Sequence, residues 1–401
     1  MADFPLAGVK LKLPDGFTVQ ALDAGDGSDR EAVIRFAKKS PDRTVYHAPP
    51  YFQFARSQTT RPGIKGAELI LVSHNSNPLF ALPAHPQGRS ILTHYSGVLF
   101  PEGSHEATLR RAVQALVELM AANRHLRFSC LQAPVAPAYE DAARTTLLES
   151  LLAGCGVPLE RTYTRMLPVG ERTYCKAALG SRSNGDSAEA VAVDRTALEG
   201  EQLAAYAPAT RNKIRKAIRN DVDISYYLAD VAASRDAAYE IFTPIHRASW
   251  ERTGMQPHDR DYWTKFSTAI TEGGGRDLIV IASAPGEGPI ATVSFHLYEG
   301  RAIYWAGVSL EPAQRLGANP LCLHAALTVS AALGTQVVEL GRFLPREPSA
   351  KERAITAYKA QFGGELVRVL AFSSPLRRRD RLARIPRRAA RTALVSLSRT
   401  R

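Results

Sequence analysis

Strands and amphipathic helices alternate along this chain, and the second half repeats this theme. In the first half, two predicted strands at 67–74 and 78–86 precede a long amphipathic helix at 108–125. A strand, a second helix at 143–156 and a further strand at 160–169 follow. Alternation of this kind favours an α/β fold.

The second half follows a Gly/Ser-rich stretch at 178–190, which is typical of a linker or loop. Helices come first, three consecutive strands follow, and helices and strands then alternate. This order indicates mixed α/β units rather than a doubly wound Rossmann sheet. The predicted elements are helices near 199–220 and 234–253, strands at 277–285, 289–300 and 301–310, a helix at 320–334, a strand at 336–343, a short helix at 350–361 and a strand at 364–374.

At 401 residues the chain is long enough for two domains. We therefore predict an α/β fold with a mixed sheet, in a first domain at 1–175 and a second at 176–375. The two domains are expected to be copies of one architecture, because strands and helices alternate in both.

The positive charge is concentrated in a C-terminal tail at 376–401. The formal net charge is +12, but this tail holds ten arginines and one aspartate, which leaves +3 for the other residues. Apolar residues recur every three or four positions between the arginines, so a helical tail would suit anionic lipid or RNA. A disordered basic extension is the alternative. The total charge therefore says little about the partner of the two domains.

Other sequence signals narrow the class of protein. No apolar run of about 18 residues could span a membrane, and the N-terminus lacks the pattern of a signal peptide, so we expect a cytoplasmic protein. The four cysteines are far apart and form no C-x-x-C pair, so neither a zinc site nor a disulfide framework is indicated. We predict no bound metal.

The turn before the helix at 320–334 contains Gln314, Gly317 and Asn319 in the sequence QRLGAN. Pro320 stands where the first helical residue is expected, and free N–H groups at such a helix start can hold a phosphate. An ordinary strand-to-helix turn is the alternative. The spacing is similar to the Q/R-x-x-G-x-G/A turn of GNAT acyltransferases, which holds the pyrophosphate of acyl-coenzyme A. The last position here is Asn, and these three residues are the predicted cofactor-binding set only if acyl-coenzyme A is used.

Further stretches occur in one order across residues 15–375: PPYFQF, THYSGVLFP, RNKIRKAIRNDVDI, AIYWAGVS, LGTQVVELGRF and AYKAQFGGELV. Together they resemble the FemABX family of aminoacyltransferases. The resemblance implies two tandem GNAT-like domains that transfer an amino acid from aminoacyl-tRNA to an amine, typically on a peptidoglycan precursor. No long heptad pair interrupts the second half, so the chain is similar to the short FemX-like form, without a coiled-coil arm.

The stretch at 211–219 predicts a strongly basic helix. Arg211 and Arg215 lie on one face, Lys213 lies nearby, and Ile214 and Ile218 mark the buried side. A solvated charged face is one interpretation. The other is a ridge that binds phosphate, because guanidinium groups bind phosphate in bidentate fashion. We predict that Arg211, Lys213 and Arg215 bind substrate phosphates.

A second candidate stretch, at 244–263, carries His246, Trp250 and Arg252 near the end of a helix. Trp250 and Tyr262 could wall an acceptor pocket, since such pockets combine aromatic walls with few polar groups. His246 is a candidate base or, alternatively, a structural residue of the helix. His246, Trp250 and Arg252 are included in the predicted substrate-binding set.

Lys359 lies between Tyr358 and Phe362 in a segment of mostly small and apolar residues. A surface lysine is the alternative interpretation. The resemblance implies that this lysine faces the reacting ester, where an ammonium would stabilise the oxyanion that forms as an amine attacks the carbonyl. Lys359 is the predicted catalytic residue, and Tyr304, Tyr358 and Phe362 are predicted to contact substrate.

These patterns predict an aminoacyltransferase with tRNA and a nucleotide- or lipid-linked amine as partners and no bound cofactor. Peripheral contact with the inner face of an anionic membrane would run through the tail. One alternative is an acyl-coenzyme A-dependent N-acyltransferase in polysaccharide or specialised-metabolite biosynthesis. The other is a non-catalytic RNA- or membrane-binding protein of the same fold.

Overall fold

The computed structural model describes residues 2–6, 9–23, 27–58, 67–87, 90–93, 97–102, 105–131, 142–169, 189–343 and 350–374. The predicted boundary at 175/176, most of the Gly/Ser-rich stretch and the arginine-rich tail lie outside these residues. Within the described part, no helix is both long and apolar enough to cross a membrane.

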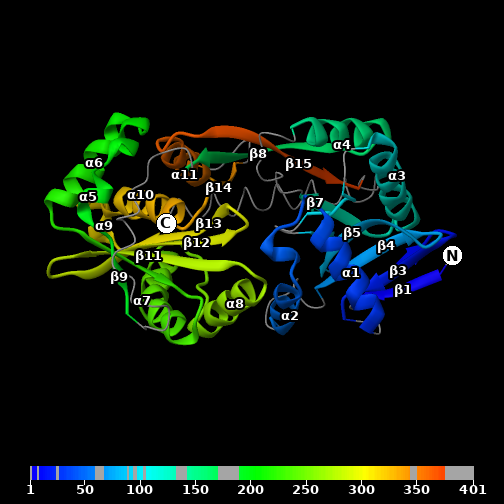
Figure 1. Ribbon diagram of the computed structural model, residues 1–401, viewed down its shortest axis with the longest axis horizontal. Coiled ribbons are helices and arrows are strands. Elements are labelled where there is room, and N and C mark those ends of the chain that lie inside the picture. Colours follow the sequence, from blue (N-terminus) through cyan, green and yellow to red (C-terminus); the bar gives the residue numbers. More distant parts are fainter. Residues whose placement is uncertain are drawn as a thin grey trace, which may run out of the picture.

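One mixed sheet of 13 strands runs through both halves of the chain, in the order β3-β4-β5-β6-β7-β15-β8-β14-β13-β12-β11-β10-β9 (Figure 1). Its first-half strands are β3 (Phe17–Ala21), β4 (Glu68–His74), β5 (Asn77–Gln87), β6 (Ser90–Leu92), β7 (Arg127–Leu131) and β8 (Leu159–Pro168). Its second-half strands are β9 (Val191–Ala192), β10 (Asp223–Leu228), β11 (Arg276–Ala284), β12 (Gly288–Tyr298), β13 (Arg301–Ser309), β14 (Val337–Phe343) and β15 (Glu365–Ser373). A separate hairpin consists of β1 (Ala2–Leu6) and β2 (Val9–Leu13).

The two halves share one pairing pattern, and each completes it with a strand from the other. In the first half, β3 to β6 pair antiparallel, β6 and β7 pair parallel, and β7 pairs antiparallel with β15. In the second half, β10 to β13 pair antiparallel, β13 and β14 pair parallel, and β14 pairs antiparallel with β8. The strands β8 and β15 also pair with each other, so the exchange makes one continuous sheet. The predicted mixed α/β sheet is confirmed.

Helices cover both faces of the sheet (Figure 1). They are α1 (Gly27–Lys39), α2 (Pro49–Ser57), α3 (Glu106–Ala122), α4 (Ala142–Gly154), α5 (Arg195–Leu198), α6 (Pro208–Arg219), α7 (Ala232–Glu251), α8 (Arg260–Glu272), α9 (Glu311–Leu316), α10 (Ala318–Ala332) and α11 (Ala350–Ala360), with 3₁₀ turns η1 (Val45–His47) and η3 (Glu201–Ala205). Almost every residue of α10 is buried, because this helix lies between the sheet and α6.

The opposite face of the second half carries α7 and α8, and here the two halves meet. Aromatic residues of η1 and α2 share a core with those of α8 and β13. Tyr46 contacts Trp305 with ring centroids 5.6 Å apart, and Phe54 contacts Phe266 at 5.1 Å. The core on the α10 side and the core on the α7 and α8 side are therefore separated by the sheet.

Several elements differ from the sequence prediction. The helix expected near 199–220 begins only at Pro208, which occupies the first helical turn, and short turns precede it. The helix α8 was not predicted, although Asp259 caps it by accepting a hydrogen bond from the Tyr262 amide at 2.8 Å. The predicted direct turn from strand to helix at 314–319 is instead largely the short helix α9, closed by Gly317.

Candidate functional site

The parallel strands β13 and β14 separate shortly after they pair. Their register covers Arg301 with Val337, Ala302 with Val338 and Ile303 with Glu339 only. Beyond Glu339, β14 continues opposite β8. This divergence opens a wedge in the sheet, with its apex at Ile303 and Glu339.

An irregularity in the neighbouring pair β12–β13 lies at the same level. Phe295 is opposite Tyr304 and Ser294 is opposite Ala306, so Trp305 is an extra residue in β13. Such a bulge bends a strand and changes the direction of the side chains after it. The bulge therefore contributes to the divergence of β13 from β14.

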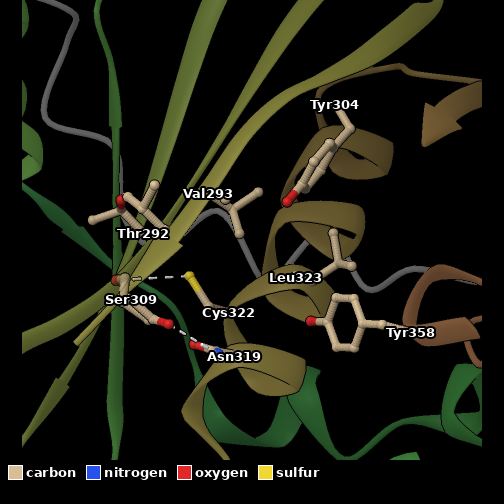
Figure 2. Close-up of a pocket in the computed structure, with 11 residues that line it drawn as sticks. Thr292, Val293, Tyr304, Ser309, Asn319, Cys322, Leu323 and Tyr358 are labelled. Atoms are coloured by element: carbon tan, nitrogen blue, oxygen red, sulfur yellow. Dashed lines mark hydrogen bonds between the residues drawn. The ribbon is translucent and has the colours of Figure 1, made fainter. Parts of the chain in front are cut away.

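A cavity of about 150 Å³ lies next to the wedge, between β12, β13 and the helices α10 and α11 (Figure 2). The hydroxyl groups of Tyr304 and Tyr358 point into it. At its wall, Asn319 donates a hydrogen bond to the Ser309 hydroxyl at 3.1 Å. The residues labelled around it are Thr292, Val293, Tyr304, Ser309, Asn319, Cys322, Leu323 and Tyr358.

The size of this cavity depends on a glycine in β13. A Cβ atom on Gly307 would collide with the hydroxyl of Tyr304, so a larger residue at this position would displace the tyrosine. Burial raises the pKa of Tyr304 and of Tyr358, and both phenols are therefore neutral donors at physiological pH.

The amine of Lys359 lies in the wedge itself. Its Nζ atom is 4.6 Å from the centroid of the Tyr304 ring on β13. A Cβ atom added to Gly341 on β14 would come within 2.9 Å of the same Nζ, so the amine is in close contact with this strand as well. The lysine is only 9% exposed. The amine is thus held between the two strands that diverge.

Burial lowers the pKa of Lys359 to about 8, and the carboxylate of Glu339 acts in the opposite direction. At pH 7 roughly nine in ten molecules then carry the ammonium. A positive charge in a confined, poorly hydrated wedge can stabilise negative charge that develops on a nearby oxygen far better than it could in water.

Two further charged residues lie at the apex of the wedge. Arg301 at the start of β13 forms a buried ion pair with Glu339 on β14. The hydroxyl of Thr164 on β8 is 3.2 Å from Glu339 Oε1 and 2.9 Å from the carbonyl oxygen of Gly341, and it can donate to either. None of these three residues was predicted from the sequence. A charged residue within the apolar strand VVELG was the available signal.

The three residues of the predicted phosphate turn lie in different surroundings. Gln314 is exposed on α9, whereas Asn319 lines the cavity. Gly317 has a φ of +77°, and a Cβ atom there would come within 2.5 Å of the carbonyl oxygen of Lys213 on α6. The glycine is thus required where α6 packs against the corner between α9 and α10. This packing covers the first turn of α10, in which Ala318 and Pro320 are buried.

The basic helix α6 has the orientation predicted from its sequence, with Ile214 and Ile218 buried. Lys213 and Arg215 are exposed. Arg211 is half-buried and donates to the carbonyl oxygens of Ala204 and Tyr206 at 3.2 and 3.0 Å. Its guanidinium therefore holds the junction between η3 and α6.

Of the residues predicted at the end of α7, His246 lies in the core and Arg252 lies at the surface. His246 is fully buried, with ring centroids 4.5 Å from Trp250 and 4.9 Å from Trp263. Burial lowers the pKa of His246 to about 4, so the ring is neutral at physiological pH. Arg252 donates to the carbonyl oxygen of Ser309 at 3.1 Å, and so reaches the wall of the cavity.

The aromatic residues Trp250 and Tyr262 flank one ring on the α7 and α8 side of the sheet. They lie 5.4 and 3.7 Å from the His258 ring, between centroids. The structure therefore brings Tyr304, Tyr358, Lys359 and Asn319 together, but it places His246 and Trp250 on the opposite face.

Phe362 is a buried core residue that supports the site rather than lining it. Its ring lies 5.5 Å from that of Tyr358 and 5.1 Å from that of Tyr206. These contacts fix the end of α11, which carries both Tyr358 and Lys359.

A larger hollow of about 550 Å³ lies between α1, α2 and the end of α8. Its lining includes Arg30, Arg43 and Glu272. Arg43 is paired with Glu299, and Arg30 lies 3.6 Å from Asp23. Both arginines of this hollow therefore have a carboxylate as a partner. Within the part of the chain that is described, no cluster of His, Cys, Asp and Glu has the geometry of a metal site.

Residues 208–360 match the family model of the acetyltransferase (GNAT) domain. Among solved structures, FemX is similar to this chain, with a TM-score of 0.55, 11% identity, and coverage of 85% of this chain and 95% of that chain. L-PGS from Bacillus licheniformis has a TM-score of 0.49 and 10% identity over 89% and 95% of the two chains. A tandem GNAT protein from the clavulanic acid biosynthesis pathway has a TM-score of 0.45 and 14% identity over 90% and 98%. No curated protein matches the sequence.

At 11% identity the similarity to FemX shows the fold alone, which is the predicted mixed α/β fold of two tandem GNAT-like units. The family model covers the cavity, the wedge and both helices that border them. The second half of the chain thus contains a region, residues 208–360, that is similar to the acetyltransferase (GNAT) domain.

Proposed function

We propose that the protein transfers an aminoacyl group from aminoacyl-tRNA to an amine acceptor and so forms a peptide bond; the similarity of residues 208–360 to the acetyltransferase (GNAT) domain supports this proposal. One observation carries this proposal: a buried lysine lies in the wedge between β13 and β14, with its amine over the ring of Tyr304. Lys359 is also the residue that the FemABX resemblance places at the reacting ester.

In the proposed reaction, the neutral amine of the acceptor attacks the ester carbonyl of the donor. Negative charge develops on the carbonyl oxygen, and the ammonium of Lys359 stabilises it within the wedge. The C–O bond to the ribose then breaks, and the ribose oxygen takes the proton that the attacking nitrogen loses. A single preorganised donor of this kind contributes about 10²–10³ in rate.

The exposed cations of α6 support tRNA as the donor. Lys213 and Arg215 are exposed on a helix that packs directly against Gly317, at the corner beside the cavity. Phosphate groups that follow this helix would lead the acceptor end of a tRNA toward the wedge. Arg211 contributes to the same surface by holding the helix in place.

The acceptor is proposed to enter from the side of Arg252, whose guanidinium lies at the wall of the cavity. The FemABX resemblance makes a peptidoglycan precursor the expected acceptor, linked to a nucleotide or to a lipid. Peripheral contact of the arginine-rich tail with anionic lipid would bring the enzyme to a lipid-linked acceptor.

An acyl-coenzyme A donor is the second candidate. The match to the acetyltransferase model favours it, and Asn319 and Tyr358 line the cavity where an acyl group would lie. The position of α6 argues against it, because the Lys213 carbonyl occupies the space in front of Gly317 and the first turn of α10 is covered. A pyrophosphate would then lack the exposed N–H groups that it needs.

The donor requirement tests the proposal directly. The purified protein would be incubated with bulk tRNA charged with labelled amino acids, and separately with labelled acetyl-coenzyme A, each with a pool of amine acceptors from a cell extract. Transfer from tRNA that is lost after RNase treatment would support the proposal. Transfer from coenzyme A alone would contradict it, and binding of RNA or lipid without any transfer would favour a non-catalytic protein.

A further inference from the structure

The ion pair at the apex of the wedge is placed next to the reacting amine rather than in an ordinary part of the core. Glu339 lies at the last paired position of β14, opposite Ile303, and the strands separate immediately after it. Gly341 contacts the amine of Lys359 two residues further along the same strand. The pairing of β14 with β8 shifts register between Glu339 and Arg342, and Gly341 within this interval has a φ of +90°, so the strand is irregular between the carboxylate and the residue that contacts the amine.

Two neighbouring strands hold the Glu339 carboxylate in one position. One oxygen pairs with Arg301 from β13, and the other lies within hydrogen-bond distance of the Thr164 hydroxyl from β8. Thr164 also lies 2.9 Å from the Gly341 carbonyl, so it contacts both ends of the segment that borders the amine. Since β8 belongs to the first half, the exchanged strand fixes this corner of the site.

The remaining ionisable groups near the amine are neutral or face elsewhere. Burial raises the pKa of Tyr304, Tyr358 and Cys322, which removes them as charges at physiological pH. Arg165 follows Thr164 on β8 but donates to the carbonyl oxygens of Gly363 and Gly364. Glu339 is the carboxylate that acts on the pKa of Lys359, and it raises this pKa.

We propose that Glu339, anchored by Arg301 and Thr164, is a positioning residue that keeps the amine of Lys359 charged and directed into the wedge. A buried ammonium is unstable unless an opposite charge lies nearby. Arg301 alone would repel it, whereas the anchored carboxylate offsets both cations. The direction in which Glu339 acts on the pKa of Lys359 agrees with this role.

The inference deepens the proposed function, because it assigns the residue that controls the charge of the proposed catalytic lysine. Its primary test nevertheless requires no donor. The difference in free energy of unfolding between the parent and Lys359→Met, measured from pH 6 to pH 10.5, reports the pKa of Lys359. The same comparison between Glu339→Gln and Glu339→Gln/Lys359→Met reports that pKa without the carboxylate.

We expect the pKa of Lys359 to fall by about one pH unit or more in the Glu339→Gln background. Glu365→Gln, which removes an exposed carboxylate from β15, is the matched control and should leave the pKa near 8. An unchanged pKa in Glu339→Gln would overturn the inference, because the carboxylate would then serve only to pair with Arg301.

Glu339→Gln leaves Arg301 and Lys359 as two buried cations and can therefore fail to fold. In that event Glu339→Gln/Lys359→Met should fold, because one cation has been removed. A double variant that also fails to fold would overturn the inference.

Where transfer is observed, the alkaline limb of its pH profile should move to lower pH in Glu339→Gln. A shifted pKa without any transfer from tRNA would leave the inference intact and refute the proposed function.

Discussion

Replacing Lys359 by methionine should stabilise the protein while it lowers the rate of transfer about 10²–10³-fold. Methionine retains an unbranched apolar chain of similar length, so the packing in the wedge is largely kept. The charge is lost, and with it the penalty of burying an ammonium. A pKa lowered from 10.5 to about 8 corresponds to about 3 kcal/mol of destabilisation of the charged form.

The pH dependence gives this prediction its specific signature. Below pH 8 the lysine is protonated in the folded and unfolded states alike, and the folded parent carries the full penalty. Between pH 8 and pH 10.5 the folded state releases its proton first, so the unfolded state binds more protons and the parent gains stability as the pH rises. The advantage of Lys359→Met should therefore be about 3 kcal/mol at pH 7 and fall to about half of that or less by pH 9.5.

Unfolding in guanidinium, followed by tryptophan fluorescence, measures this difference. All three tryptophans lie in the second half, so the signal reports on the domain that carries the lysine. Lys216→Met, at an exposed position of α6, is the control and should show no pH-dependent difference from the parent. A Lys359→Met variant that is less stable than the parent at pH 7, or whose advantage does not shrink with pH, would refute the reasoning.

Three further predictions concern the residues around the wedge. Replacing Lys213 and Arg215 together by glutamine should weaken tRNA binding and lower the slope of log affinity against log salt by about 1.5, and an unchanged slope in a binding titration would show that this face is only solvated. Gly317→Ala should lower the free energy of unfolding by about 1–3 kcal/mol, because its Cβ would collide with the Lys213 carbonyl at a positive φ; an unchanged unfolding midpoint would mean that α6 can move away. His246→Phe should leave transfer unchanged. The parent should lose stability as the pH falls from 6.5 toward 4, because the unfolded state takes up a proton there and the buried ring of His246 does not; His246→Phe should not show this loss. A large loss of transfer in His246→Phe would restore the histidine as a candidate base.

Local patterns were sufficient where an element follows one strong periodicity. The apolar stripe at 108–125 predicted α3, and the buried isoleucines of α6 were identified correctly from the spacing of charges around them. The helix α8 and the short helix α9 were missed, because their aromatic and turn-like residues resemble loop sequence. The cap at Asp259 was the signal that could have revealed α8.

The predicted site residues show the limit of the same reasoning. Lys359, Tyr358 and Tyr304 lie together, but His246 and Trp250, which looked equally suitable on an amphipathic helix, belong to a core on the other face of the sheet. Helical periodicity identifies a buried face without identifying what that face packs against. Gly317 was assigned to phosphate binding, although contact with α6 is sufficient to explain it.

The sequence by itself determined the order of helices and strands, the α/β class and the chemical groups available to the site. Only the tertiary structure decided how those groups meet. The exchange of β8 and β15 pairs strands that are about two hundred positions apart, and no local pattern encodes such a pairing. That exchange draws β14 away from β13, opens the wedge and places Thr164 beside Glu339. The charge of Lys359 depends on burial and on a neighbouring carboxylate, and both arise only when the chain has folded.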